Sequence, residues 1–166
     1  RLPGGVDATY IPAGHVLGSA QILLEHAGER VIVTGDYKRR HDPTCPPFEV
    51  TPCDIFITEA TFGLPVFCHP PIEDEMAKLL DRLAAHPDSC VLVGAYALGK
   101  AQRVIAELRR AGHRDPIYLH GAMEKMCPLY EEHGIDLGEL RLVADHAKDD
   151  MRGSIVICPP SALNDR

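Results

Sequence analysis

The stretch YIPAGHVLGSAQILLEHAGERVIVTGD (residues 10–36) holds most of three apolar runs, which cover residues 6–13, 20–26 and 30–34. Each run has the length and the aliphatic content of a β-strand, and glycine-containing connections separate them. Consecutive strands joined by tight connections are antiparallel, so the first and the third run should be parallel to each other. The stretch therefore predicts a sheet at the start of the chain.

Polar side chains follow the ends of these strands. His15 lies just past the C-terminal end of the first run, and Asp36 just past the end of the third. A fourth apolar run, residues 54–58, ends at Glu59, and the proline-rich connection before it is long enough to return the chain parallel to the third run. We therefore expect these three side chains on one edge of the sheet. Imidazole and carboxylate groups together favour zinc or a similar divalent ion, and a carboxylate can bridge two metals.

The pattern changes after Gly63, where prolines punctuate a short connection and helical and strand-like segments begin to alternate. We place a domain boundary near Leu64. Beyond it the periodicity predicts a small parallel α/β layer, with helices at residues 72–85, 98–111 and 122–133, a buried strand at 90–93, and further strands at 117–119, 140–144 and 155–158.

Composition excludes several classes of protein. Of the 166 residues, 45% are hydrophobic and 25% are charged, as in an ordinary globular protein rather than a disordered one. No apolar run approaches the roughly 20 residues that span a bilayer, and no leader-like segment precedes the first strand, so we expect a cytoplasmic location and no membrane partner. The net charge of -7 argues against a surface that coats nucleic acid indiscriminately.

The six cysteines form no C-x-x-C pair, so we expect reduced thiols in packed positions. The chain starts without a methionine and stops shortly after a strand-like run, which indicates a segment of something longer.

Three short motifs carry a resemblance to a known family. In order and spacing, GHVLGSA (residues 14–20), TGDY (34–37) and TEATFG (58–63) resemble the β-CASP family of metallo-β-lactamase-fold nucleases. The similarity is greatest to the bacterial ligase-associated DNA exonucleases, which also resemble mRNA 3′-end processing factors. It extends into the second part of the chain through VGAYALGKAQ (93–102) and YLHG (118–121).

The resemblance implies an α/β fold in which residues 1–63 form the latter part of a metallo-β-lactamase αββα sandwich and residues 64–166 an incomplete β-CASP cap domain. It implies two zinc ions, with His15 as a ligand and Asp36 as the bridging carboxylate. Glu59 matches the first motif of the cap domain, where the acid hydrogen-bonds a histidine thought to be the general acid. The implied reaction is hydrolysis of a phosphodiester, with both ions offsetting charge at phosphorus.

The chain also departs from the family pattern. The main ligand cluster, H-x-H-x-D-H, is absent, and we expect it upstream of Arg1. Two later histidine motifs are absent too, and we expect them beyond Arg166. The segment alone should therefore bind zinc weakly and cleave nothing. The substrate that the resemblance implies is nucleic acid, DNA more than RNA, in an exonuclease of end processing or repair, with a DNA ligase as a possible partner.

Basic residues near these motifs are candidates for phosphate contacts. Lys38, Arg39 and Arg40 directly follow the bridging aspartate and could grip phosphates beside the scissile bond, although a solvated loop would have the same composition. Lys100 stands where the family more often has arginine, so it keeps the charge without bidentate geometry. His120, between a strand and a helix, could contact substrate or simply begin the helix.

Three other functions stay open at this stage. The run GAYALGKA (residues 94–101) fits the G-x-x-x-x-G-K pattern of a nucleotide-binding loop, but Ala101 lacks the hydroxyl that holds magnesium. An RNA-processing nuclease of the same fold and a non-catalytic nucleic-acid-binding relative are the other two. Retention of His15, Asp36 and Glu59 argues against the non-catalytic relative. His41 and Asp42 could hold the metal ligands in place, but a polar turn before Pro43 explains them equally well, so they are not counted as site residues.

Overall fold

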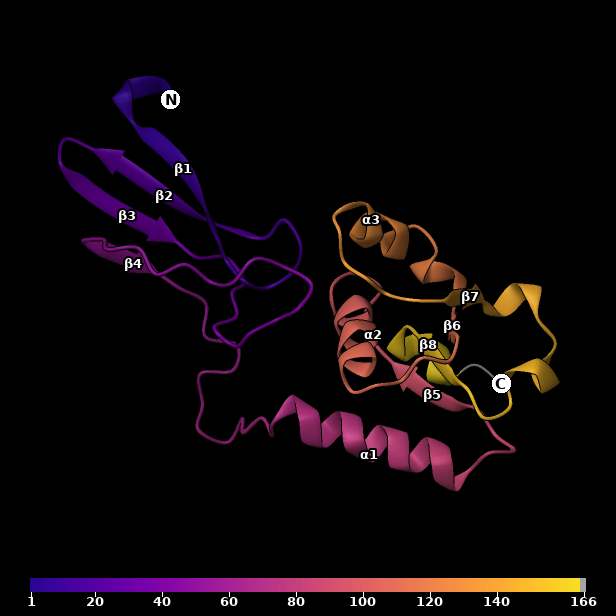
Figure 1. Ribbon diagram of the computed structural model, residues 1–166. Coiled ribbons are helices and arrows are strands. Elements are labelled where there is room, and N and C mark those ends of the chain that lie inside the picture. The colour runs from indigo at the N-terminus through magenta and orange to yellow at the C-terminus, as the bar shows by residue number, and fades with distance from the viewer. Residues whose placement is uncertain (165–166) are drawn as a thin grey trace. The chain divides into compact units, whose positions relative to one another are not determined.

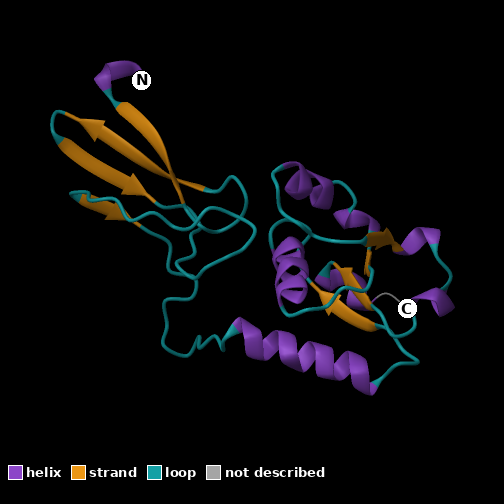
Figure 2. Cartoon of the chain, viewed as in Figure 1, coloured by secondary structure: helices purple, strands orange, loops and turns teal. Residues whose placement is uncertain are grey.

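The computed structural model describes residues 1–164, and the chain divides into two compact units, Arg1–Cys68 and His69–Arg166 (Figure 1). Figure 2 shows that the first unit is built mainly of strands and loops, whereas the second mixes helices and strands. The assignment of residues 1–63 and 64–166 to two named domains stays a prediction. Among the described residues, no helix is long and apolar enough to cross a membrane.

The first unit is a four-stranded sheet in the order β1-β2-β3-β4. Its strands are β1 (Asp7–Pro12), β2 (Ala20–His26), β3 (Glu29–Val33) and β4 (Ile55–Ile57), preceded by a short 3-10 turn at Pro3–Gly5. β2 is antiparallel to both β1 and β3, and β4 is parallel to β3. The predicted strands and their directions are therefore confirmed, and the C-terminal ends of β1, β3 and β4 share one edge.

One face of this sheet carries the core of the unit. Leu23 on β2 and Ile32 on β3 are buried, whereas Tyr10 and the three side chains of β4 are exposed. Gln21 is buried at the N-terminal end of β2, where its amide donates to the carbonyl oxygens of Pro12 and Glu49. These two hydrogen bonds link the segment at residues 46–50 to the end of β1, beside the loop that carries His15.

The second unit contains a four-stranded parallel sheet in the order β5-β8-β6-β7. Its elements are α1 (Ile72–Ala85), β5 (Val91–Gly94), α2 (Lys100–Arg110), β6 (Ile117–Leu119), α3 (Met126–Glu132), β7 (Leu140–Leu142) and β8 (Ile155–Cys158), with 3-10 turns at Gly121–Met123, Val143–Asp145, Lys148–Met151 and Pro160–Asn164. β6 and β8 are buried throughout, as central strands of a covered parallel sheet should be. The predicted parallel α/β layer is confirmed.

Three sequence-based expectations about this unit were wrong in detail. The strand expected to be buried, β5, is an edge strand, and Leu92 is 54% exposed. The helix expected at residues 122–133 is split, because Pro128 has no N–H for the carbonyl of Glu124, and α3 begins two residues before it. All six cysteines are free thiols, but Cys68 and Cys90 are exposed rather than packed.

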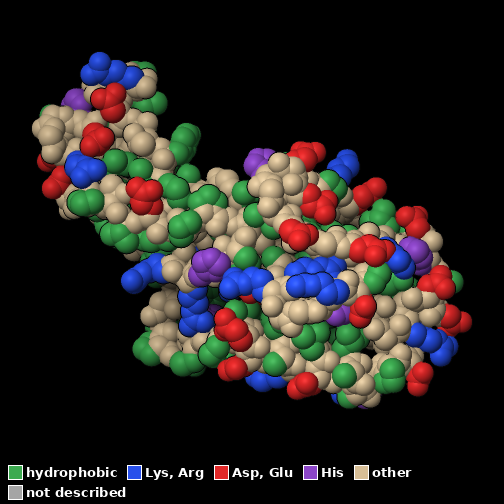
Figure 3. Space-filling view, in the orientation of Figure 1, with side chains coloured by type: hydrophobic (Ala, Val, Ile, Leu, Met, Phe, Trp, Pro, Cys, Tyr) green, Lys and Arg blue, Asp and Glu red, His purple; other side chains and the backbone are tan. Residues whose placement is uncertain are grey.

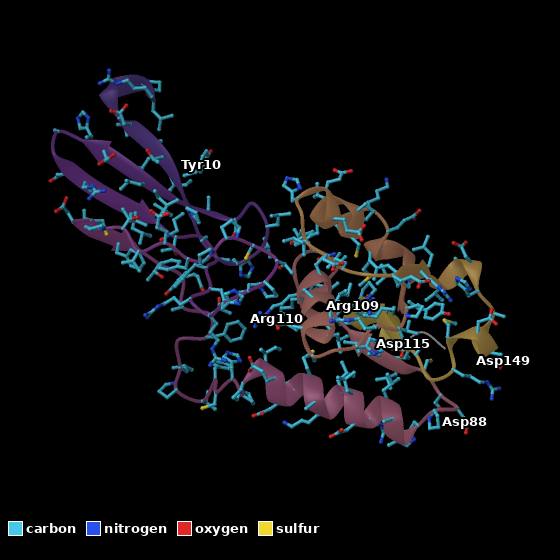
Figure 4. The ribbon with its side chains drawn as sticks, viewed as in Figure 1. Tyr10, Asp88, Arg109, Arg110, Asp115 and Asp149 are labelled. Carbon is cyan, nitrogen blue, oxygen red and sulfur yellow. The ribbon has the colours of Figure 1, made fainter. Side chains whose placement is uncertain are left out.

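A buried arginine joins the elements of the second unit. Arg109, on α2, is only 8% exposed, and its guanidinium donates to the carbonyl oxygens of Leu137, His113, Asp115 and Glu139. Figure 4 labels it beside its neighbour Arg110 and near Asp115. Desolvation and the nearby charge of Arg114 lower the pKa of Arg109 from its ordinary value. One side chain therefore satisfies the backbone of two separate connections, one after α2 and one before β7.

Candidate metal and nucleic-acid site

His15 and Asp36 meet at the shared edge of the first sheet. The imidazole Nε2 of His15 lies 3.8 Å from a carboxylate oxygen of Asp36. Two atoms that bind one zinc ion at about 2 Å are roughly 3 to 4 Å apart, so this distance is compatible with a shared metal. Both side chains are open to solvent and can accept a ligand. The geometry that the sequence predicted for this pair is present, and its metal-binding role stays a prediction.

The loop that carries His15 is fixed by short-range hydrogen bonds and by a glycine. The Ser19 hydroxyl accepts from the backbone N–H groups of His15 and Val16. Gly14 has a φ of 69° and packs so closely that a Cβ there would lie 2.5 Å from the carbonyl oxygen of Lys38 and 2.7 Å from the backbone nitrogen of Phe48. Only glycine meets both conditions. The backbone of His15 is thereby held against the segment that follows Asp36.

Lys38 connects the loop that carries His15 to the segment after Asp36, and it is paired with the buried acid Asp42. Its ammonium donates to the carbonyl oxygen of His15, at 3.1 Å, and to the carboxylate of Asp42. Asp42 is buried and also accepts from the backbone N–H and the hydroxyl of Thr44. Burial alone would raise the pKa of Asp42, but the hydrogen bonds from Lys38 and Thr44 outweigh it and lower the pKa below its ordinary value of 3.8. The sequence analysis did not count Asp42 as a site residue, because a polar turn before Pro43 explained it.

Replacing Asp42 by asparagine should therefore destabilise the first unit by about 2 kcal/mol or more, because the largely buried ammonium of Lys38 loses its anionic partner. The folded pKa of Asp42 is depressed, so this stability is present above the ordinary pKa and is lost as the pH falls below it. Urea unfolding at neutral and at acidic pH measures both effects. The exposed Asp7→Asn is the matched control, and an Asp42→Asn protein as stable as that control would contradict this role.

Glu59 follows β4 on the same edge of the sheet, but its carboxylate is hydrogen-bonded to Thr61 rather than paired with His15. A carboxylate oxygen of Glu59 accepts from the backbone N–H of Thr61 at 2.6 Å. Hydrogen bonds from Thr61 lower the pKa of Glu59, and the charge of His15 adds a smaller lowering effect. Glu59 is thus near enough to His15 to share its electrostatic field while its own carboxylate is oriented by the turn that follows β4. Its predicted catalytic role is untested.

The residues that could bind a metal form a pair rather than a complete site. Within residues 1–164, no group of three or more His, Cys, Asp or Glu side chains is placed to hold a metal ion. Zinc in a catalytic site takes about three protein ligands and one water. His15 and Asp36 have the donor chemistry of two members of such a set, and a zinc ion at this pair would need further ligands.

The predicted phosphate-binding residues fall into three places. Arg39 and Arg40 are exposed, directly beyond Asp36 in the first unit. Lys38 precedes them, but its ammonium is already committed to Asp42 and to the His15 carbonyl. Lys100 and His120 are exposed in the second unit, where they follow β5 and β6 at the carboxyl edge of the parallel sheet. Over this unit, the face drawn in Figure 3 interleaves acidic and basic side chains, in keeping with the net charge of -7.

The loop between β5 and α2 does not form a phosphate cradle. A nucleotide-binding loop needs backbone N–H groups that point at the phosphates. Here the N–H groups of Gly99, Lys100 and Ala101 donate to the Gln102 side chain and to the carbonyl oxygens of Leu98 and Tyr96, respectively. Leu163 packs against Gly94, so that a Cβ on Gly94 would lie 2.6 Å from it. The resemblance of this loop to the G-x-x-x-x-G-K pattern is therefore limited to sequence.

Curated proteins of known name are similar to this chain. A probable DNA ligase from Opitutus terrae is 34% identical over 98% of the chain. An endoribonuclease of Aspergillus fumigatus is 35% identical over 74% of it, and subunit 3 of the cleavage and polyadenylation specificity factor of Dictyostelium discoideum is 32% identical over 74% of it. The chain is homologous to proteins of the β-CASP branch. No family model matches it.

The β-CASP resemblance found from three motifs is thus confirmed, in a chain that spans about one sixth of the length of these relatives: 16%, 15% and 17%, respectively. Its fold is a mixed α/β chain with two four-stranded sheets, homologous to part of these β-CASP proteins. The comparisons leave the roles of individual residues untested. Tyr96, within the loop at residues 94–101, was not predicted as a site residue, and it is an exposed aromatic residue between β5 and α2.

Proposed function

We propose that the whole protein to which this segment belongs is a metal-dependent nuclease that hydrolyses phosphodiester bonds in nucleic acid. The observation that carries the proposal is the His15–Asp36 pair, 3.8 Å apart at a strand-end edge, in a chain homologous to nucleases. The architecture that we propose around it is the latter part of a metallo-β-lactamase sandwich followed by a β-CASP cap. The pair would need ligands from elsewhere to complete a two-zinc site.

The chemistry of such a site divides between the metal and this chain. When bound, zinc would supply positive charge that stabilises the developing charge at phosphorus. His15 would hold the metal through Nε2, and Asp36 would hold two cations near each other through one carboxylate. The Ser19 hydroxyl fixes the loop that carries His15, and the Lys38 ammonium joins this loop to the segment after Asp36. Glu59, already oriented by Thr61, would accept a hydrogen bond from a histidine that acts as general acid.

Arg39 and Arg40 would contact the phosphates on either side of the scissile bond, because both are exposed just beyond Asp36. Lys38 is better placed as a positioning residue, since its ammonium already bridges Asp42 and the His15 carbonyl. Lys100 and His120 would contact nucleic acid from the second unit.

DNA is the substrate that we favour, with exonuclease action in end processing or repair and a DNA ligase as partner. The relative named as a probable DNA ligase matches 98% of the chain, including nearly all of the second unit. A cytoplasmic location is part of the same proposal. RNA processing is the second candidate, because relatives named as endoribonucleases match 74% of the chain at similar identity.

Removal of metal from the whole protein should abolish hydrolysis, and zinc should restore it. We expect a fall of about 100-fold or more after dialysis against a chelator, because the metal ions supply several kcal/mol of charge stabilisation. The measurement is cleavage of end-labelled single-stranded DNA and of the matching RNA, and the labelled products distinguish the two substrates and exonuclease from endonuclease action. The isolated segment should cleave neither. Unchanged cleavage in chelator would contradict the metal-dependent proposal, and no cleavage under any metal would favour a non-catalytic relative.

A further inference from the structure

Tyr96 is an aromatic side chain presented at the carboxyl edge of the parallel sheet. It follows Ala95, just beyond β5, and is 61% exposed. The ammonium of Lys100 lies over its ring, 5.0 Å from the centroid, in a cation–π contact. The exposed ring and the cation therefore form one unit, in which a positive charge lies over an aromatic ring.

The backbone beneath Tyr96 is rigid. The N–H of Ala95 donates to the carbonyl oxygen of Cys158 on β8, and the N–H of Ala101 donates to the carbonyl oxygen of Tyr96 itself. The fully buried amide of Gln102 donates to the Ala97 carbonyl and accepts from the Gly99 N–H. Because this backbone is already held by hydrogen bonds, a ligand that bound the ring would cost little backbone conformational entropy.

His120 lies on the same edge of the sheet. It follows β6, and β8 separates β6 from β5, so the two strand ends are about 10 Å apart at the usual strand spacing. The Nδ1 atom of His120 accepts from the backbone N–H of Ala122. The neutral ring therefore carries its proton on Nε2, which is a donor on an exposed side chain. Ligands of parallel α/β sheets bind outside the carboxyl ends of the strands, which is this edge.

We propose that Tyr96 is a stacking platform for one base of a single-stranded nucleic acid, with Lys100 at the phosphate of the same nucleotide and His120 donating to a neighbouring phosphate. The proposal rests on the proposed function and specifies that the nucleic acid bound at this edge is single-stranded. Only an unpaired base offers its face to an aromatic ring, so this edge selects single strands or frayed ends over intact duplex. Stacking tolerates any base, so the contact carries no sequence preference.

The test is binding, measured by fluorescence anisotropy in chelator, so that no hydrolysis occurs. The probes are a labelled 12-nucleotide oligothymidine, the same oligonucleotide with abasic sites throughout, and a 12-base-pair duplex. Tyr96→Ala should weaken binding of the oligothymidine about 10-fold or more, and Tyr96→Phe should stay within about 2-fold, because the ring is what stacks. Lys100→Ala should weaken binding and reduce its salt dependence by about one counterion. Leu98→Ala, at a neighbouring exposed residue, is the matched control.

Two comparisons decide the outcome. The unmodified chain should prefer the oligothymidine to the abasic probe and to the duplex, and Tyr96→Ala should lose the preference over the abasic probe. The proposal is overturned if Tyr96→Ala binds like the unmodified chain, if the abasic probe binds equally well, or if the unmodified chain does not bind. Because this assay contains no metal, its failure leaves the proposed hydrolysis intact, and failure of the metal test leaves the binding result intact.

Discussion

Replacement of Asp36 by asparagine should lower the nuclease activity proposed for the whole protein about 100-fold or more while the fold is retained. Asparagine has the size and shape of aspartate but lacks the negative charge that would hold two cations close together. The side chain of Asp36 is 74% exposed, so the substitution removes no core packing. The loss should therefore appear in catalysis and in metal content rather than in the free energy of unfolding.

The measurement is the rate of cleavage of a labelled oligonucleotide, together with the zinc content of the purified protein. Glu29→Gln is the matched control, because Glu29 is an exposed acid at the opposite edge of the same sheet. A folded Asp36→Asn protein that cleaves at the rate of the control would contradict the role proposed for this carboxylate. Retained zinc with lost activity would instead assign Asp36 to the reaction rather than to metal binding.

Replacement of Arg109 by alanine should lower the free energy of unfolding of the second unit by more than about 3 kcal/mol. The substitution removes the donor for four backbone carbonyl oxygens, and a buried acceptor without a partner costs about 1 to 3 kcal/mol. Lysine should not rescue the protein, because a single ammonium cannot reproduce the planar set of donors. Gly138→Ala should act in the same direction, since a Cβ there would lie 2.5 Å from the Arg109 Nε.

Arg110→Ala is the matched control for this experiment. Arg110 is the next residue on the same helix, and its side chain is half exposed, with a long contact to Glu107. Its replacement should change the stability by no more than about 0.5 kcal/mol. The measurement is urea unfolding followed by circular dichroism. Equal stability of the two variants would show that the carbonyl oxygens find other partners when Arg109 is removed.

The sequence predicted the bounds of helices and strands well where apolar residues recur at a regular spacing. The helix at 72–85 and the strands at 20–26, 117–119 and 155–158 have the predicted bounds, because their apolar residues follow helical or strand spacing without interruption. The helix expected from Leu98 begins at Lys100 instead, since Gly99 has a φ of 82°, which no helix contains. The position of a strand within its sheet depends on pairing between distant segments, so β5 could not be recognised as an edge.

The candidate site was predictable to the extent that topology determined it. Two antiparallel connections fix β1 and β3 as parallel, and that alone brings the residues after them, His15 and Asp36, to one edge. The roles of Asp42 and Arg109 were not predictable, because each depends on partners that tertiary folding supplies. The sequence placed Asp42 in a polar turn and Arg109 within the helix predicted at residues 98–111, and neither prediction contains burial.

The close packing around Gly14 has an evolutionary consequence. Three loops meet there, the one that carries His15, the one that follows Asp36 and the one around Phe48, and backbone atoms of the last two stand where any side chain on Gly14 would lie. Relatives should therefore vary these loops together rather than singly. An insertion in one of them would move the histidine away from the aspartate, so we expect length changes among homologues to collect at the far end of the sheet, in the turn at residues 27–28.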